Sequence, residues 1–214
     1  MVLKEVCIGN YRDIQPAINA GADRIELNAD LAVGGVTPSF GVIQESVKLC
    51  HQFNIPIVVM LRPRGGSFVY NEAEFTMMST DLVNIATLNA DGIAFGCLNK
   101  DGSINDIQMD TLLGMADQLG LKSVMHMAFD AIPTKLQAKS IDWLVDHGCS
   151  RILTHGGSLD KTIESNIDNL KNIISLAKDK IEILPGGGIT YKNFQDIIDK
   201  IRVNQVHGTK IVKF

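Results

Sequence analysis

Residues 123–130, with the sequence SVMHMAFD, place a titratable histidine and a carboxylate beside an apolar run. In an extended chain alternate residues share a face, so His126 and Asp130 are predicted to point the same way. Burying polar groups costs free energy unless they are paired. The pattern indicates either two core groups satisfied by their neighbours, or a site at one end of a sheet where His126 acts as a general acid or base.

Eight short apolar stretches alternate with seven stretches of helical periodicity, and together they cover the chain. The predicted strands are residues 4–8, 24–28, 56–61, 92–98, 123–130, 151–154, 181–184 and 205–207, and the predicted helices are residues 11–20, 40–53, 71–88, 105–119, 134–147, 160–178 and 191–200. Strict alternation of this kind predicts an α/β fold, the (β/α)8 TIM barrel. After the last strand and the Gly208-Thr209 pair only residues 210–214 remain, so the eighth helix is missing. A doubly wound open sheet is the alternative.

Composition limits the classes of protein that this chain can represent. It has 214 residues, of which 45% are hydrophobic and 21% charged, and its formal net charge is −4. These values fit a single globular domain over residues 1–214, and the negative charge argues against nucleic acid as a partner. No apolar run reaches the roughly 18 residues of a membrane span, and the first residues do not resemble a signal peptide. We expect a cytoplasmic protein, with a homo-oligomer left open.

Polar residues gather where the predicted strands end, which is the catalytic end of a TIM barrel. By contrast, Lys4, Lys122 and Arg151 lie at the opposite ends of their strands, where we expect them to be solvated. The polar residues at the catalytic end are Glu5, Glu26, Arg62, Arg64, His126, Asp130, Thr154, His155 and His207.

Four of these residues are candidates for acid–base catalysis, namely Glu5, Glu26, His126 and Asp130. We expect Glu5, Glu26 and His126 to meet Arg62 within hydrogen-bonding reach, because burying any of them alone is costly. A divalent metal held by His126, His207 and a glutamate is a further possibility for this end of the barrel. The alternative is a purely structural network of glutamate and arginine side chains.

Arginines and glycines at the same end indicate a small anionic or phosphorylated ligand. Arg62 and Arg64 form a candidate fork for a carboxylate or phosphate, with Thr154 and His207 as further candidate substrate-binding residues. Residues 186–188 are a glycine triplet before a predicted helix. The backbone N–H groups there, at Gly187 and Gly188, suit an anion, although glycine also simply permits a tight turn.

The cysteines are widely separated, and no two of them form a C-x-x-C pair. Their spacing excludes a zinc ribbon, and a disulfide framework is not expected in a reducing compartment. Cys7 and Cys97 lie on predicted strands, and Cys7 shares a face with Glu5. A thiol inside the barrel is a soft ligand suited to copper(I), while the alternative is a small buried hydrophobic side chain. Met125 and Met127 are predicted to face away from His126 and to pack under helices.

Several stretches together resemble the CutC family. They are GADRIELN at 21–28, GGVTPS at 34–39, RPRGGSFVY at 62–70, H-x-AFD at 126–130, RILTHGG at 151–157 and GGGI at 186–189. The resemblance implies a cytoplasmic (β/α)8 barrel linked to copper homeostasis, with copper(I) as the ion handled and Cys7 and Cys97 as candidate ligands. The resemblance does not imply an established reaction. The alternative function is therefore a TIM-barrel enzyme that acts on a small anionic or phosphorylated substrate by acid–base or metal-assisted chemistry. The chain departs from the family pattern at Asn28, where cysteine is frequent, and at Met127, where arginine is frequent.

Overall fold

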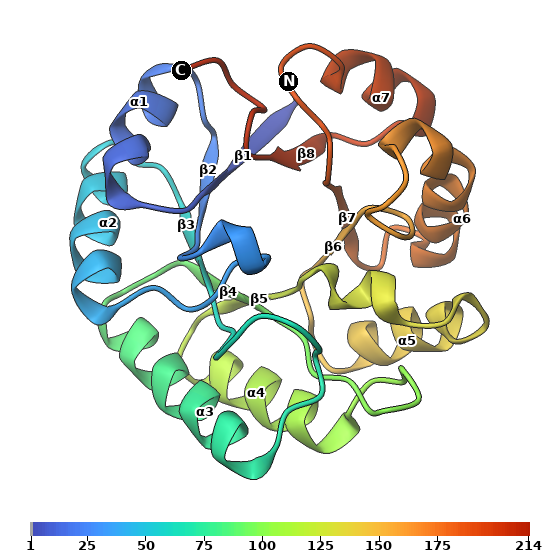
Figure 1. Ribbon diagram of the computed structural model, residues 1–214, viewed down its shortest axis with the longest axis horizontal. Coiled ribbons are helices and arrows are strands. Elements are labelled where there is room, and N and C mark those ends of the chain that lie inside the picture. The colour runs from blue at the N-terminus through green and yellow to red at the C-terminus, as the bar shows by residue number, and fades with distance from the viewer. Residues whose placement is uncertain (1) are drawn as a thin grey trace.

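Eight parallel strands surround the centre of the molecule, and helices form a ring outside them (Figure 1). The structure is a computed structural model that describes residues 2–214. The strands are β1 (Leu3–Ile8), β2 (Arg24–Leu27), β3 (Ile57–Met60), β4 (Gly92–Phe95), β5 (Lys122–Met125), β6 (Arg151–Thr154), β7 (Glu182–Pro185) and β8 (Gln205–Gly208). The α-helices are α1 (Ile14–Asn19), α2 (Phe40–Gln52), α3 (Glu72–Thr87), α4 (Asp106–Gln118), α5 (Thr134–Asp146), α6 (Ile167–Ala177) and α7 (Phe194–Ile201). Four short 3-10 helices complete the list: η1 (Tyr11–Asp13), η2 (Leu31–Val33), η3 (Met127–Ala131) and η4 (Ile163–Asn166).

The sheet is a nearly closed barrel. Hydrogen bonds join the strands in the order β7-β6-β5-β4-β3-β2-β1-β8. β7 and β8 lie side by side, where Gln205 Nε2 donates to Glu182 Oε2 at 3.2 Å. This topology confirms the predicted (β/α)8 barrel and excludes the open doubly wound sheet.

The place of an eighth helix is taken by the C-terminal residues. Residues 209–214 form no helix and run between α7 and α1 (Figure 1). Ile211 and Val212 in this segment are buried in the core between the strands and the helices. Across residues 2–214, no helix combines the length and apolar character needed to cross a bilayer.

Side-chain alternation divides the buried residues into an outer and an inner core. One set of strand residues, such as Ile25, Val59 and Ile93, packs under the helices. The opposite set on β3 to β7 forms a small apolar cluster inside the barrel, which consists of Val58, Met60, Ala94, Val124, Leu153 and Leu184. The inward positions of β1, β2 and β8 carry polar side chains instead, so one side of the barrel interior is apolar and the other is polar.

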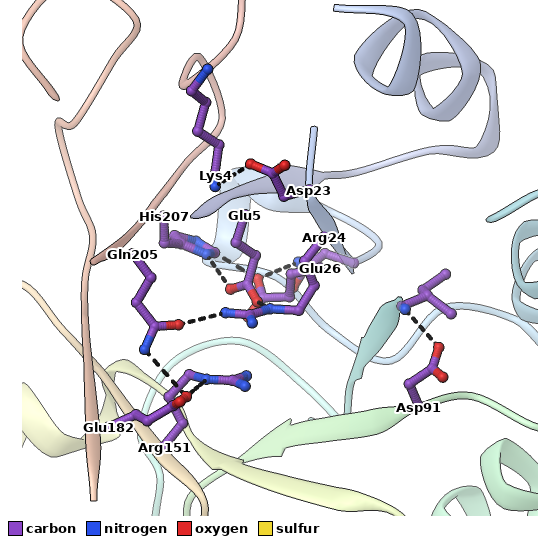
Figure 2. Close-up of polar contacts among 12 residues, drawn as sticks. Lys4, Glu5, Asp23, Arg24, Glu26, Asp91, Arg151, Glu182, Gln205 and His207 are labelled. Carbon is purple, nitrogen blue, oxygen red and sulfur yellow. Dashed lines mark hydrogen bonds and ion pairs between the residues drawn. The ribbon is translucent and has the colours of Figure 1, made fainter. Parts of the chain in front are cut away.

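The polar side is a continuous network of charges and amides, which is buried apart from the exposed side chain of Glu182 (Figure 2). Arg24 donates to Glu5 and, at 3.0 Å, to Gln205. Glu182 accepts from Gln205 and from Arg151 Nε, the latter at 3.0 Å. The expectation that Arg151 is solvated is wrong, because its side chain is buried and paired with Glu182.

The predicted strand at 123–130 is too long. β5 ends at Met125, and residues 127–131 form η3. The turn is fixed by His126, whose Nδ1 accepts from the N–H of Ala128 at 3.2 Å and whose carbonyl accepts from Phe129. The alternation rule therefore does not hold beyond Met125. The prediction for Met127 is wrong, since its side chain packs against the inner apolar cluster.

Replacing Glu5 by Gln should lower the free energy of unfolding by about 3–5 kcal/mol, because the change leaves the buried charge of Arg24 without a counter-ion. Urea denaturation measures the loss. Glu45→Gln is the matched control, since Glu45 pairs with Lys48 at 2.6 Å and more than half of each side chain is exposed. That variant should cost less than about 1 kcal/mol. Equal effects of the two substitutions would contradict the structural role of the buried network.

Candidate functional site

A cavity of about 110 Å³ lies inside the barrel at the C-terminal ends of the strands. It brings together residues that lie near the ends of six strands, β1, β2, β3, β5, β6 and β8, with η2 contributing Leu31. Its lining residues are Cys7, Glu26, Asn28, Leu31, Gly34, Met60, Arg62, Phe68, His126, Met127, Leu153 and His207.

Three of the lining residues form a cluster of metal-ligand type. One ligand atom from each of Cys7, Glu26 and His207 lies within 4.8 Å of the others. In the ladders of β1, Cys7 lies opposite Glu26 and Glu5 opposite His207, so parallel pairing with β2 and β8 builds the cluster. We call these three residues the Cys7 cluster.

Glu5 lies deeper than the cavity and orients His207. Its Oε1 lies 2.8 Å from Nδ1 of His207 (Figure 2). Burial alone would raise the pKa of Glu5, but the hydrogen bond with His207 and the charge of Arg24 outweigh it and hold the pKa at about 2. An ionised carboxylate only accepts, so Nδ1 of His207 carries the proton and donates. The other nitrogen, Nε2, lies 3.9 Å from Oε2 of Glu26. It carries a proton when the ring is a cation and a lone pair when the ring is neutral.

The protonation of the Cys7 cluster follows from burial and charge. Burial raises the pKa of the Cys7 thiol well above its ordinary value, and the charge of Glu26 raises it further. Burial lowers the pKa of His207, but the charge of Glu26 and the hydrogen bond with Glu5 outweigh it, so that pKa is raised. Without a metal, the cluster thus favours a neutral thiol beside a histidine that readily takes a second proton.

Asn28 connects two members of the Cys7 cluster. Its Nδ2 lies 2.9 Å from Oε2 of Glu26 and 3.4 Å from Sγ of Cys7. The residue was not among the predicted site residues. Its spacing of two from Glu26 was the available signal, because both side chains then share the inner face of β2 and its extension.

His126 lines the cavity and carries an unpaired donor. Because Nδ1 accepts from Ala128, the proton of the neutral ring is on Nε2, which has no protein partner in the described chain. Burial, with a contribution from the charge of Arg62, lowers the pKa of His126 to about 3. A neutral ring with an unpaired Nε2–H can donate a hydrogen bond, which suits neither a general base nor a metal ligand at that nitrogen.

Arg62 lines the cavity but is not paired with a glutamate. Its guanidinium donates to backbone carbonyls, at 3.2 Å to Gly34, 3.2 Å to Gly35 and 2.7 Å to Gly66. Glu26, Arg62 and His126 thus share one cavity, while Glu5 lies below it. No hydrogen bond joins any two of these four residues in the part of the chain that the structure describes.

Arg64 and Asp130 lie outside the cavity lining. Arg64 pairs with Glu74 at 2.6 Å, and Glu74 also forms the capping box of α3. Asp130 accepts from Thr154 Oγ1 at 2.6 Å and from the backbone N–H groups of His155 and Gly157. Arg64 is thus paired with a carboxylate, and Asp130 accepts three hydrogen bonds. Both side chains connect loop segments and neither is available to a ligand in the cavity.

Cys97 and the glycine turn also lie apart from the cavity lining. Cys97 is fully buried in the outer core, where its backbone N–H contacts the sulfur of Met109. Gly187 and Gly188 both have positive φ, but residues 189–193 separate them from α7, so they are not at the start of that helix. Copper binding by Cys97 and anion binding by the turn remain predictions that the cavity does not support.

Two methionines complete the cavity, and sequence reasoning missed their role. Met60 ends β3 and Met127 opens η3, and both line the cavity. A Cβ on Gly186 would lie 3.1 Å from Cε of Met127 and 3.0 Å from Cδ2 of His207. The methionine methyl group and the imidazole therefore lie near each other, with glycine leaving them room.

Comparison with known proteins identifies the family. The model of the CutC family matches residues 2–212. A CutC family protein of Enterococcus faecalis is 47% identical over 211 residues, which are 99% of this chain and 100% of the relative. A CutC family protein of Streptococcus pyogenes is 40% identical over 212 residues, again 99% of this chain and 100% of the relative.

Solved structures agree with this assignment. The crystal structure of a protein of Streptococcus agalactiae, described as the copper homeostasis protein CutC, has a TM-score of 0.95 and 42% identity, and the match covers 99% of this chain and 100% of that one. Deoxyribose phosphate aldolase of Aeropyrum pernix has a TM-score of 0.74 but 10% identity over 97% of this chain and 86% of its own, which shows a common fold only. The chain belongs to the CutC family.

Proposed function

We propose that this protein binds copper(I) at the Cys7 cluster, with the thiolate of Cys7 and Nε2 of His207 as ligands. The observation that carries the proposal is the convergence of one ligand atom each from Cys7 and His207 within 4.8 Å in the cavity of the barrel. Sulfur and imidazole nitrogen are ligands that copper(I) accepts readily, and thiolate in particular selects it. The Streptococcus agalactiae relative is described as a copper homeostasis protein, and this description supports copper as the bound ion.

The surroundings of the cluster fit this ion in two further ways. Glu5 binds the Nδ1–H of His207, which is the carboxylate–histidine arrangement that orients metal-binding imidazoles. Met60 and Met127 add thioether sulfurs to the same cavity. Glu26, a hard oxygen ligand, suits copper(I) poorly and instead supplies negative charge beside the bound cation. Bound copper would be the cargo of the protein, held inside the barrel.

All four cysteines are free thiols, and only Cys7 is not fully buried. Free thiols persist in reducing compartments, which supports a cytoplasmic location for copper handling.

A second candidate is an enzyme that moves a proton on a small anionic substrate. The observation that favours it is the buried carboxylate of Glu26 in a cavity at the end of the barrel where active sites of this fold lie. Exchange of carbon-bound hydrogen in a panel of small carboxylic acids, followed by NMR in deuterated water, tests it. The wild-type protein should promote exchange and Glu26→Gln should not; no exchange with any compound removes this candidate.

Replacing Cys7 by Ser should weaken copper(I) binding by more than about 100-fold, because losing a ligand costs more than losing one of its outer-shell partners. Competition with a chromophoric copper(I) chelator measures the affinity. Cys97→Ala is the matched control, since Cys97 is fully buried and belongs to the outer core. Unchanged affinity in the Cys7 variant, or an equal loss in both, would rule out the assignment.

Copper(I) affinity should rise as the pH rises from about 6 to about 8, because the ion must displace protons from its ligands. The raised pKa of His207 keeps Nε2 protonated at the lower end of this range, and the raised pKa of Cys7 keeps the thiol neutral throughout. Chelator competition at several pH values, corrected for the protonation of the chelator, gives the slope. An affinity independent of pH would exclude both ligands.

A further inference from the structure

The cavity has a second side, which is built around His126. The imidazole is 3% exposed, and its Nε2–H has no acceptor among residues 2–214. Buried side-chain donors are nearly always paired, so an unpaired donor on a side chain that lines a cavity points to a ligand. The orientation of the ring is not free, because the N–H of Ala128 holds Nδ1 as an acceptor.

A buried positive charge lies on the same side. Arg24, Arg64 and Arg151 each pair with a carboxylate, but Arg62 has none among the residues that the structure describes. Its guanidinium lies 4.7 Å from the ring centre of Phe68, and that ring lies 5.1 Å from the ring of His126. Buried charges are ordinarily paired, so this side of the cavity is short of one negative charge.

The other walls restrict the class of ligand. Glu26 from β2 lies across the barrel from His126 and repels a second negative charge. Met60, Phe68 and Leu153 give the cavity apolar walls. A volume of about 110 Å³ favours a small ligand. These features favour a small monoanion with an apolar tail over a phosphate dianion.

We propose that this side of the cavity binds the carboxylate group of a small monocarboxylic acid. One carboxylate oxygen accepts from Nε2–H of His126, and the charge of Arg62 balances the ligand's negative charge. The site uses neither Cys7 nor His207, so it stands whether or not copper(I) binds to the Cys7 cluster.

Titration of metal-free protein with acetate and propionate, followed by proton–nitrogen NMR of the imidazole groups, tests this site. Free His126 should show the Nε2–H tautomer, and its Nε2–H signal should shift on saturation with either acid. His126→Phe should lose about tenfold or more in affinity, as expected for a hydrogen bond to a charged group. His51→Phe is the control, because His51 is an exposed histidine that pairs with Asp91 on the surface.

Acetamide and inorganic phosphate should both bind more weakly than acetate, because the first lacks the charge and the second carries too much. Cys7→Ser should retain acetate binding while it loses copper(I), which separates this proposal from the copper site. A Nδ1–H tautomer of His126, His126 signals unmoved by saturating acetate, or acetamide binding as tight as acetate would each overturn the inference. The NMR observations on the unmodified protein hold even if His126→Phe does not fold.

Discussion

The carboxylate of Glu5 is buried near the centre of the barrel, and its charge must be compensated there. An ionised carboxylate away from water is costly unless it is paired and hydrogen bonded. Arg24 from β2 and His207 from β8 both contact it. The charge of this one carboxylate therefore connects β1 to the strands on both of its sides. Arg24 in turn requires Gln205, which continues the network to Glu182. The same carboxylate thus holds the lower network and orients the histidine of the cavity.

The two histidines of the cavity have opposite roles because their Nδ1 atoms have opposite partners. The carboxylate of Glu5 makes Nδ1 of His207 a donor, and its Nε2 can then offer a lone pair to a metal. The backbone N–H of Ala128 makes Nδ1 of His126 an acceptor, and its Nε2 is then an N–H. One cavity therefore has a side suited to a soft cation and a side suited to a small anion. The apolar inner cluster on β3 to β7 supports both sides without adding charge.

The fold was predictable because strand and helix patterns alternate strictly, and so was the end of the barrel at which Glu26, His126 and His207 gather. Alternation also places Glu5 and Cys7 on one face of β1, and both lie on the polar inner side. Arg151 lies at the start of β6, which suggests a solvated side chain, but it shares its face of the strand with Leu153, an inner-cluster residue, and therefore points into the barrel. Met127 could not be placed by alternation, since the chain leaves the extended conformation at His126. The hydrogen bond that causes this turn is not visible in the sequence.

The partners of the arginines were likewise beyond sequence reasoning. Arg62 and Arg64 are separated by one residue, yet one contacts loop carbonyls beside the cavity and the other contacts Glu74 at the start of α3. The two arginines have different partners because loops that are distant in the sequence pack beside them. The local sequence pattern does not specify how those loops pack.

The central claim is that Glu5 orients His207 so that its Nε2 and the sulfur of Cys7 hold one copper(I) ion. Anomalous diffraction at the copper absorption edge, from crystals of copper(I)-loaded protein grown under reducing conditions, tests it most directly. We expect a single strong peak between Sγ of Cys7 and Nε2 of His207, with the contact between Glu5 and Nδ1 preserved. A peak at Cys97 or on the surface, or a loaded protein with no peak in the cavity, would contradict it.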